Sequence, residues 1–221
     1  MMKKILYHGS PHIIQKPIYG HGKSYNDYGL GFYCTEHLEL AKEWACTLNT
    51  DGYVNKYEID LSDLAILNLS DEKYSILHWL TLLIEHRQFR IESPIMKLGC
   101  EWLKNNYHID LSPYDIIIGY RADDSYFAFA RAFLTNQISL SQLSYAMHLG
   151  KLGHQVVIKS PEAFNRIQFK SSEYVDSSLY YPKRKTRDEK ARHDFKKELE
   201  KIDLNSVYIR DLIRKEVKQY E

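Results

Sequence analysis

The sequence is poor in the residues that define several protein classes. Its 221 residues include only three cysteines, Cys34, Cys46 and Cys100, which are too few and too scattered for a disulfide framework or a zinc knuckle. No apolar run approaches the roughly 18 residues that a membrane span needs. The two lysines near the N-terminus precede no long apolar stretch, so we do not expect a signal peptide. These absences predict a cytoplasmic protein without a membrane partner.

An excess of charge of one sign is lacking as well. The 30 basic and 29 acidic side chains leave a formal net charge of +1, which gives no global reason to expect a nucleic-acid or membrane partner. Apolar residues make up 44% of the chain, a content typical of a folded globular protein. The abundant residue is tyrosine, with 18 copies. Tyrosine suits stacking clefts, although core packing absorbs most of it.

Short apolar segments mixed irregularly with helical patterns predict an α+β fold, because no βαβα rhythm is present. We expect strands at residues 4–7, 32–34, 53–60, 115–119, 155–158 and 166–175. Thr35 is the expected N-cap of a first helix. Further helices are expected within residues 72–105, after Asp123-Asp124, at the capping box of Ser139 and Gln142, and at Ser160.

The composition changes after about residue 180. Residues 183–201 are dense in both charges, and Ala191, Phe195, Leu199 and Ile202 form a narrow apolar stripe at helical spacing. We therefore divide the chain into a domain of residues 1–178 and a C-terminal helical appendage of residues 179–221. The stripe either packs onto its own domain, which we favour, or forms a docking face for a partner protein.

Two segments carry candidate binding residues. The first is Tyr7-His8-Gly9-Ser10, in which glycine would let a ligand reach the backbone and the imidazole would donate to a ribose hydroxyl. The second runs from Gly29 to Thr35 and continues into a helix, so that Tyr33 and Trp44 offer two flat aromatic faces. Each segment alone has a plain structural explanation, and the second fits neither a dinucleotide fingerprint nor a P-loop.

In this order and spacing, the two segments resemble the NAD site of the diphtheria-toxin-like and poly(ADP-ribose)-polymerase-like ADP-ribosyltransferases. More narrowly, the chain resembles a bacterial family of small ADP-ribosyltransferase-like domains of unknown function. That resemblance includes residues 114–124, the Gln-Val-Val-Ile strand at 155–158 and the tail that opens at Tyr180. It implies a split antiparallel β-sheet core with inserted helices, NAD as the substrate, and no metal.

The resemblance also implies a role for each matching residue. His8 would hold the adenosine-side ribose, Gly9 would pair its backbone with the nicotinamide carboxamide, and Ser10 would contact a ribose. Tyr33 would stack on the nicotinamide and Trp44 would close its other face. Such a clamp favours departure of nicotinamide through geometry more than through acid–base chemistry. We therefore expect His8 and Tyr33 to line one cleft.

The catalytic position departs from the family pattern. The pattern has a glutamate at the start of a later strand, where it binds the 2′-OH of the nicotinamide ribose and stabilises developing positive charge. The matching residue here is Gln155, whose amide carries no negative charge. Either a carboxylate elsewhere assists, or the chain turns NAD over poorly. Asp123 and Asp124 are the acidic candidates, with Glu162 a weaker one, and simple helix capping explains them at least as well.

The resemblance thus implies an NAD-dependent mono-ADP-ribosyltransferase, an enzyme of the glycosyltransferase class, with a protein or nucleic-acid acceptor. Bacterial domains of this kind often act as toxins or anti-phage effectors that a partner restrains, so an antitoxin or regulatory protein is a further expected partner. Three alternatives stay open. They are a catalytically weak or inactive NAD-binding or protein-interaction module of the same fold, an NAD glycohydrolase, and an unrelated hydrolase or nuclease. The sequence has no G-x-S-x-G elbow to favour a hydrolase.

A basic cluster at the start of the tail has two readings. Lys183, Arg184, Lys185 and Arg187 could contact the phosphates of a nucleic acid. Acidic residues follow at once, at positions 188 and 189. We therefore favour a solvated helix start.

Overall fold

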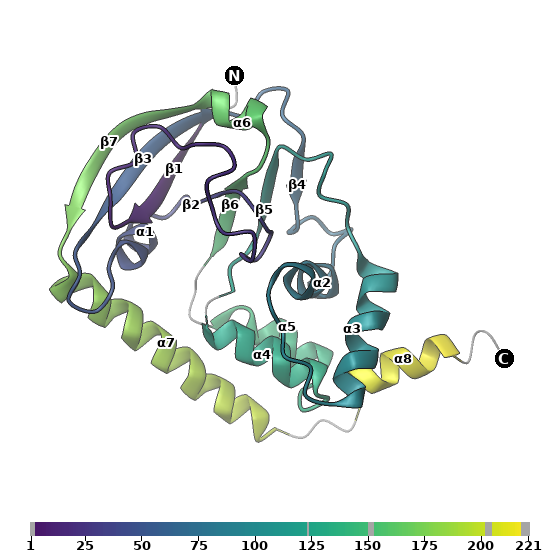
Figure 1. Cartoon of the computed structure of the whole chain (residues 1–221). Coiled ribbons are helices and arrows are strands. Elements are labelled where there is room, and N and C mark those ends of the chain that lie inside the picture. The colour runs from purple at the N-terminus through teal and green to yellow at the C-terminus, as the bar shows by residue number, and fades with distance from the viewer. Residues whose placement is uncertain (1–2, 123, 150–152, 202–204, 218–221) are drawn as a thin grey trace.

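The structure is a computed structural model that describes residues 3–122, 124–149, 153–201 and 205–217. These residues form an α+β fold with one mixed seven-stranded sheet and eight helices (Figure 1). The strands are β1 Lys3–Ser10, β2 Phe32–Thr35, β3 Gly52–Asp60, β4 Ile66–Asn68, β5 Ile116–Tyr120, β6 His154–Ile158 and β7 Ile167–Val175. The helices are α1 Leu38–Ala45, α2 Ile76–His86, α3 Pro94–Tyr107, α4 Asp124–Leu134, α5 Leu140–Ala146, α6 Pro161–Arg166, α7 Ser177–Leu199 and α8 Ile209–Val217. Within the described ranges, no helix is both long and apolar enough to cross a membrane.

The sheet divides into two parts at its centre. Its strand order is β4-β5-β6-β2-β1-β3-β7, and all neighbours are antiparallel except β4 and β5. Strand β1 pairs with β3 along its whole length, from Lys3 to Ser10, but its register with β2 has a single Cα pair, Tyr7 with Thr35. Beyond Tyr7 the two parts therefore separate. The segment His8-Gly9-Ser10 lies at this opening.

Different helices cover the two parts of the sheet. Helices α2 to α5 pack on the part that contains β4, β5 and β6 and enclose large buried side chains such as Trp79, Phe129 and Phe133 (Figure 1). Helix α1 packs on the part made of β1, β3 and β7. This packing is so close that a Cβ on Gly9 would lie 2.1 Å from the carbonyl oxygen of Ala41. Gly9 is therefore required by the contact between strand and helix.

Most of the expected elements are present. All six expected strands form, and the capping box of Ser139 and Gln142 and the cap at Ser160 are confirmed. The N-cap expectation for Thr35 is wrong. Thr35 is the last residue of β2, its hydroxyl accepts a hydrogen bond from the backbone N–H of His37 at 3.2 Å, and His37 occupies the cap. The short parallel strand β4 was not expected from the sequence.

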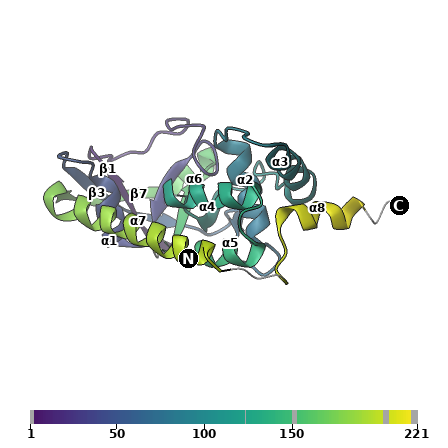
Figure 2. The same cartoon turned by 90° about the horizontal axis from the view of Figure 1, so that it is seen from below.

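Helix α7 begins at Ser177 and continues through Pro182. It runs along the outside of α1 and α4 (Figures 1 and 2). Ala191 and Phe195 are buried, and the Phe195 ring lies 4.1 Å from that of Phe129. These two residues of the apolar stripe therefore pack onto the chain itself, whereas Leu199 is 40% exposed. Ile202, the fourth member, lies outside the described residues.

Candidate functional site

His8 is fixed in one orientation and in its neutral form. Its Nδ1 lies 2.7 Å from the backbone carbonyl oxygen of Tyr33. A carbonyl only accepts hydrogen bonds, so Nδ1 carries the proton. Burial, helped by the charge of Arg121, lowers the pKa of His8 and outweighs the opposing effect of that hydrogen bond. In the neutral ring Nε2 is unprotonated and can only accept a hydrogen bond. From the sequence the imidazole was expected to donate to a ribose hydroxyl, so the direction of that hydrogen bond is reversed.

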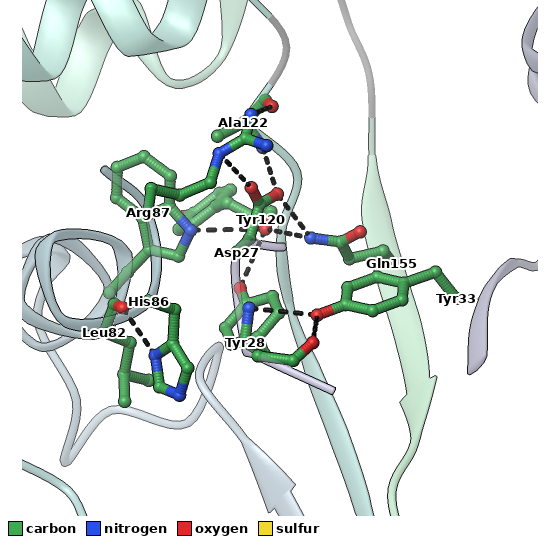
Figure 3. A network of polar contacts seen from close by, with 11 residues as sticks. Asp27, Tyr28, Tyr33, Leu82, His86, Arg87, Tyr120, Ala122 and Gln155 are labelled. Carbon is green, nitrogen blue, oxygen red and sulfur yellow. Dashed lines mark hydrogen bonds and ion pairs between the residues drawn. The ribbon is translucent and has the colours of Figure 1, made fainter. Parts of the chain in front are cut away.

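Tyr33 is held by its hydroxyl group. The hydroxyl donates to the carbonyl oxygen of Gly29 at 2.5 Å and accepts from the backbone N–H of Tyr28 at 3.1 Å (Figure 3). Gly29 has a φ of +72°, and a Cβ there would lie 2.5 Å from Cδ2 of His86. Only glycine allows this loop shape. The loop before β2 therefore fixes the position of the Tyr33 ring.

One cavity of about 720 Å³ brings the two motif segments together. His8, Gly9, Ser10, Tyr33 and Gln155 all line it. They come from β1, β2 and β6, which meet where the sheet divides. The volume lies in the range of small-molecule sites, about 300–1,000 Å³. The structure thus places five of the residues singled out from the sequence around one space.

Trp44 does not line this cavity. The Trp44 ring on α1 is covered by Arg121, whose Cζ lies 3.5 Å from the ring centroid, and Arg121 itself lines the cavity. The expectation that Trp44 closes the second face of a bound ring is therefore not met. Its role here is to support a cationic side chain.

Gln155 is directed at a carboxylate. The side chain is only 2% exposed, and its Nε2 donates to Oδ2 of Asp27 at 2.9 Å and to the carbonyl oxygen of Tyr120 at 3.1 Å (Figure 3). Asp27 also lines the cavity. The position that resembles the family's glutamate therefore holds an amide that is hydrogen-bonded to a negative charge from another segment.

Asp27 is buried and bound on several sides. Its Oδ2 accepts from the backbone N–H of Ala122 at 2.9 Å, and its Oδ1 lies 3.3 Å from Nε of Arg87. Burial raises the pKa of Asp27, and the contacts with Ala122, Arg87 and Gln155 oppose that rise. The sequence reasoning missed this residue because it lies in an irregular loop without periodicity. One signal was available: Asp27 is the only acidic residue between Ser10 and Tyr33.

Of the acidic candidates named from the sequence, only Glu162 has a described side chain. Asp123 lies outside the described residues, and α4 begins at Asp124, whose side chain lies outside them as well. Glu162 forms an ion pair with Arg166 at 2.8 Å on α6 and does not line the cavity. Among the described residues, Asp27 is the carboxylate that lines the cavity with His8 and Tyr33.

The cavity wall is rich in positive charge. Its cationic side chains are Lys23, Arg87, Arg121 and Arg184. Among the described wall residues, Asp27 is the one carboxylate. This surplus of cations favours an anionic ligand.

The fold is thus an α+β domain whose mixed sheet divides beside a polar, cation-rich cavity. The chain belongs to the family described as "Protein of unknown function (DUF3990)", which it matches over residues 4–169. No curated protein and no solved structure matches the chain. The matched region contains every cavity segment described above except the part of α7 that carries Arg184.

Proposed function

We propose that this cavity binds NAD and that the protein transfers ADP-ribose from it to an acceptor, on a fold of the ADP-ribosyltransferase type. One observation carries the proposal: the His-Gly-Ser end of β1, Tyr33 and Gln155, far apart in the sequence, line a single cavity. The division of the sheet beside that cavity is consistent with the split sheet that the resemblance implies.

The wall offers partners for the nicotinamide, a ribose hydroxyl and the pyrophosphate of NAD. Tyr33 presents a ring fixed through its hydroxyl, which suits stacking on the nicotinamide. Nε2 of His8 accepts a hydrogen bond from a ribose hydroxyl. Lys23, Arg87 and Arg121 supply positive charge for the pyrophosphate.

The chemistry needs stabilisation of a cation. The bond between ribose C1′ and the nicotinamide nitrogen breaks, and nicotinamide leaves as a neutral molecule with the bonding electrons. An oxygen or nitrogen of the acceptor then forms a bond to the cationic C1′ of the ribose and loses its proton to solvent. Asp27 supplies the negative charge that Gln155 lacks, and the amide of Gln155 orients it at 2.9 Å. A charge held in a fixed position is effective at this task.

Transfer is tested by incubating the purified protein with NAD labelled in its adenylate part, together with a cell lysate. Label on a macromolecule supports transfer and identifies the acceptor as protein or nucleic acid. Release of free ADP-ribose and nicotinamide without labelled acceptor supports a glycohydrolase. NAD binding with neither outcome supports a non-catalytic module. If NAD produces no heat of binding and no thermal shift, the proposal fails.

Asp27→Asn separates catalysis from binding. Loss of the carboxylate should reduce turnover by about 10²–10³-fold, the usual effect of losing one electrostatic stabiliser of the transition state. NAD affinity should change far less, because the cation-rich wall remains. Asp60→Asn is the matched control, since Asp60 accepts from the backbone of Ser62 and does not line the cavity. Equal turnover in Asp27→Asn and the wild type, with both folded, would remove Asp27 from the mechanism.

A further inference from the structure

The C-terminal helix α7 reaches the candidate NAD cavity, although it lies outside the region that matches the family. Arg184 of α7 lines the cavity together with Ser10 and Arg121. Its side chain is half-buried, and in the described part of the chain it forms no ion pair or hydrogen bond. Because this half-buried guanidinium has no partner among the described residues, it can bind an anionic ligand in the cavity.

The position of Arg184 is fixed from both sides along the helix. On the N-terminal side, Tyr180 and Tyr181 pack against the cluster formed by α1, β3 and β7. On the C-terminal side, Arg187 binds Glu43 of α1 through two contacts, Nε to Oε2 at 2.9 Å and Nη2 to Oε1 at 2.5 Å. Glu43 is only 3% exposed, whereas Arg187 is partly exposed. The two parallel contacts make this ion pair geometrically specific.

One face of α7 carries an aromatic anchor, the cavity-lining Arg184 and the ion pair with α1, as the helical spacing of these residues explains. Tyr180, Arg184, Arg187 and Ala191 are separated by three or four residues, so they lie along one face of α7. The face begins with an aromatic anchor, presents Arg184 to the cavity, and continues with the ion pair and the buried Ala191. The flanking Lys183 and Lys185 are exposed and lie 3.7 Å from Glu39 and Glu189. Arg184 therefore differs from the surface lysines beside it.

We propose that Arg184 binds the pyrophosphate of the dinucleotide, which makes α7 part of the ligand site. The inference rests on the proposed NAD function for the choice of ligand. A guanidinium pairs with two phosphate oxygens at once, and Arg184 would do so beside Arg121 on the same wall. The basic cluster does not lie at a helix start, because α7 begins at Ser177. Lys183 and Lys185 are solvent-exposed as the sequence favoured, whereas Arg184 lines the cavity and Arg187 binds Glu43.

The test compares the wild type with Arg184→Gln, Arg184→Lys and Lys185→Gln, the last as a control on the same helix. Calorimetric titration with ADP-ribose, NAD, inorganic pyrophosphate and nicotinamide measures each affinity. Arg184→Gln should weaken ADP-ribose and NAD by about 10- to 100-fold, as expected for a hydrogen bond to a charged group. Arg184→Lys should recover part of that loss, because it restores the charge without the fork. Nicotinamide should bind equally well, and Lys185→Gln should behave as the wild type.

The outcomes separate this inference from the proposed function. If the wild type binds NAD and Arg184→Gln binds it equally well, the role of Arg184 is overturned while NAD binding stands. If the wild type does not bind NAD but binds pyrophosphate in a manner that depends on Arg184, the anion site stands and the NAD function falls. If the wild type binds none of the phosphate ligands, both are overturned. Thermal unfolding of each variant shows that α7 remains docked.

Discussion

The ring of Tyr33 faces the cavity because its hydroxyl is bound on two sides by the loop that precedes β2. Two different losses can therefore be introduced at this residue. Removing the ring removes the stacking surface, whereas removing only the oxygen loosens the loop. These changes affect NAD affinity to different extents.

Tyr33→Ala should weaken NAD binding by about 10- to 100-fold, since stacking of a base on an aromatic side chain contributes about 1–3 kcal/mol. Tyr33→Phe keeps the ring and should change the affinity only a few-fold. Calorimetric titration of both variants with NAD measures the difference. Equal affinities of the alanine variant and the wild type, in folded protein, would remove Tyr33 from the site.

The surroundings of Gln155 show why a glutamate, which the ADP-ribosyltransferase pattern has at this position, cannot simply be introduced. A glutamate at this position would bring a second carboxylate to Asp27, at a place where the amide nitrogen now lies 2.9 Å from Oδ2. Two buried carboxylates in contact share one proton, so the pKa of one of them rises. We therefore expect Gln155→Glu to give no gain in turnover near neutral pH.

The same variant should have an altered pH dependence of stability. A carboxyl whose folded pKa is raised binds its proton more tightly in the folded state, so Gln155→Glu should gain stability as the pH falls through that raised pKa towards about 4.3, the ordinary value of glutamate. Urea unfolding at a series of pH values measures this change against the wild type. A variant with the wild-type pH profile would show that the two side chains do not meet.

At the scale of elements, helix α7 packs onto the rest of the chain, which is the arrangement that the apolar stripe favoured in the sequence. Its buried residues Ala191 and Phe195 contact side chains of the domain. The apolar stripe offers a matched pair of sites for testing this docking, because Phe195 is 7% exposed and Leu199 is 40% exposed.

Phe195→Ala should lower the free energy of unfolding by about 3–5 kcal/mol, the usual cost of removing a buried phenylalanine ring. Leu199→Ala should lower it by about 0.5 kcal/mol or less, as for an exposed position. Urea denaturation followed by circular dichroism measures both. Similar small losses in the two variants would mean that α7 is not docked on Phe129.

The sequence predicted elements better than it predicted the site. Strands such as 53–60 and 155–158 are predicted by apolar patterns that depend only on neighbouring residues. The roles of Trp44 and Asp27 depend instead on contacts between distant segments. Arg121 covers the Trp44 ring, and Asp27 reaches Gln155 across 128 positions of the chain. No local pattern encodes such contacts, so they required the fold.

At the scale of the whole molecule, partly buried histidines should make stability depend on pH. Burial is the largest cause of the lowered pKa of His8, His78 and His154. In the unfolded chain these residues would titrate near pH 6.5. Below that pH the unfolded state binds protons that the folded state does not, so stability falls. Asp27 has a raised pKa and acts in the opposite direction at lower pH.

The free energy of unfolding should therefore fall as the pH is lowered from about 7.5 to 5.5, by at most about 1.4 kcal/mol per pH unit for each such histidine. His8→Gln should flatten this dependence, because one of the groups is removed. Urea unfolding at several pH values measures both slopes. An identical slope in His8→Gln would mean that His8 is not held neutral by burial.

We propose above that the opening between the two parts of the sheet is a dinucleotide site. A crystal structure of the protein grown with excess NAD tests it most directly. We expect the nicotinamide ring against Tyr33, a ribose hydroxyl at Nε2 of His8, and the pyrophosphate among the arginines of the wall. A dinucleotide bound elsewhere on the molecule, or a cavity that stays free of it at saturating NAD, would contradict the claim.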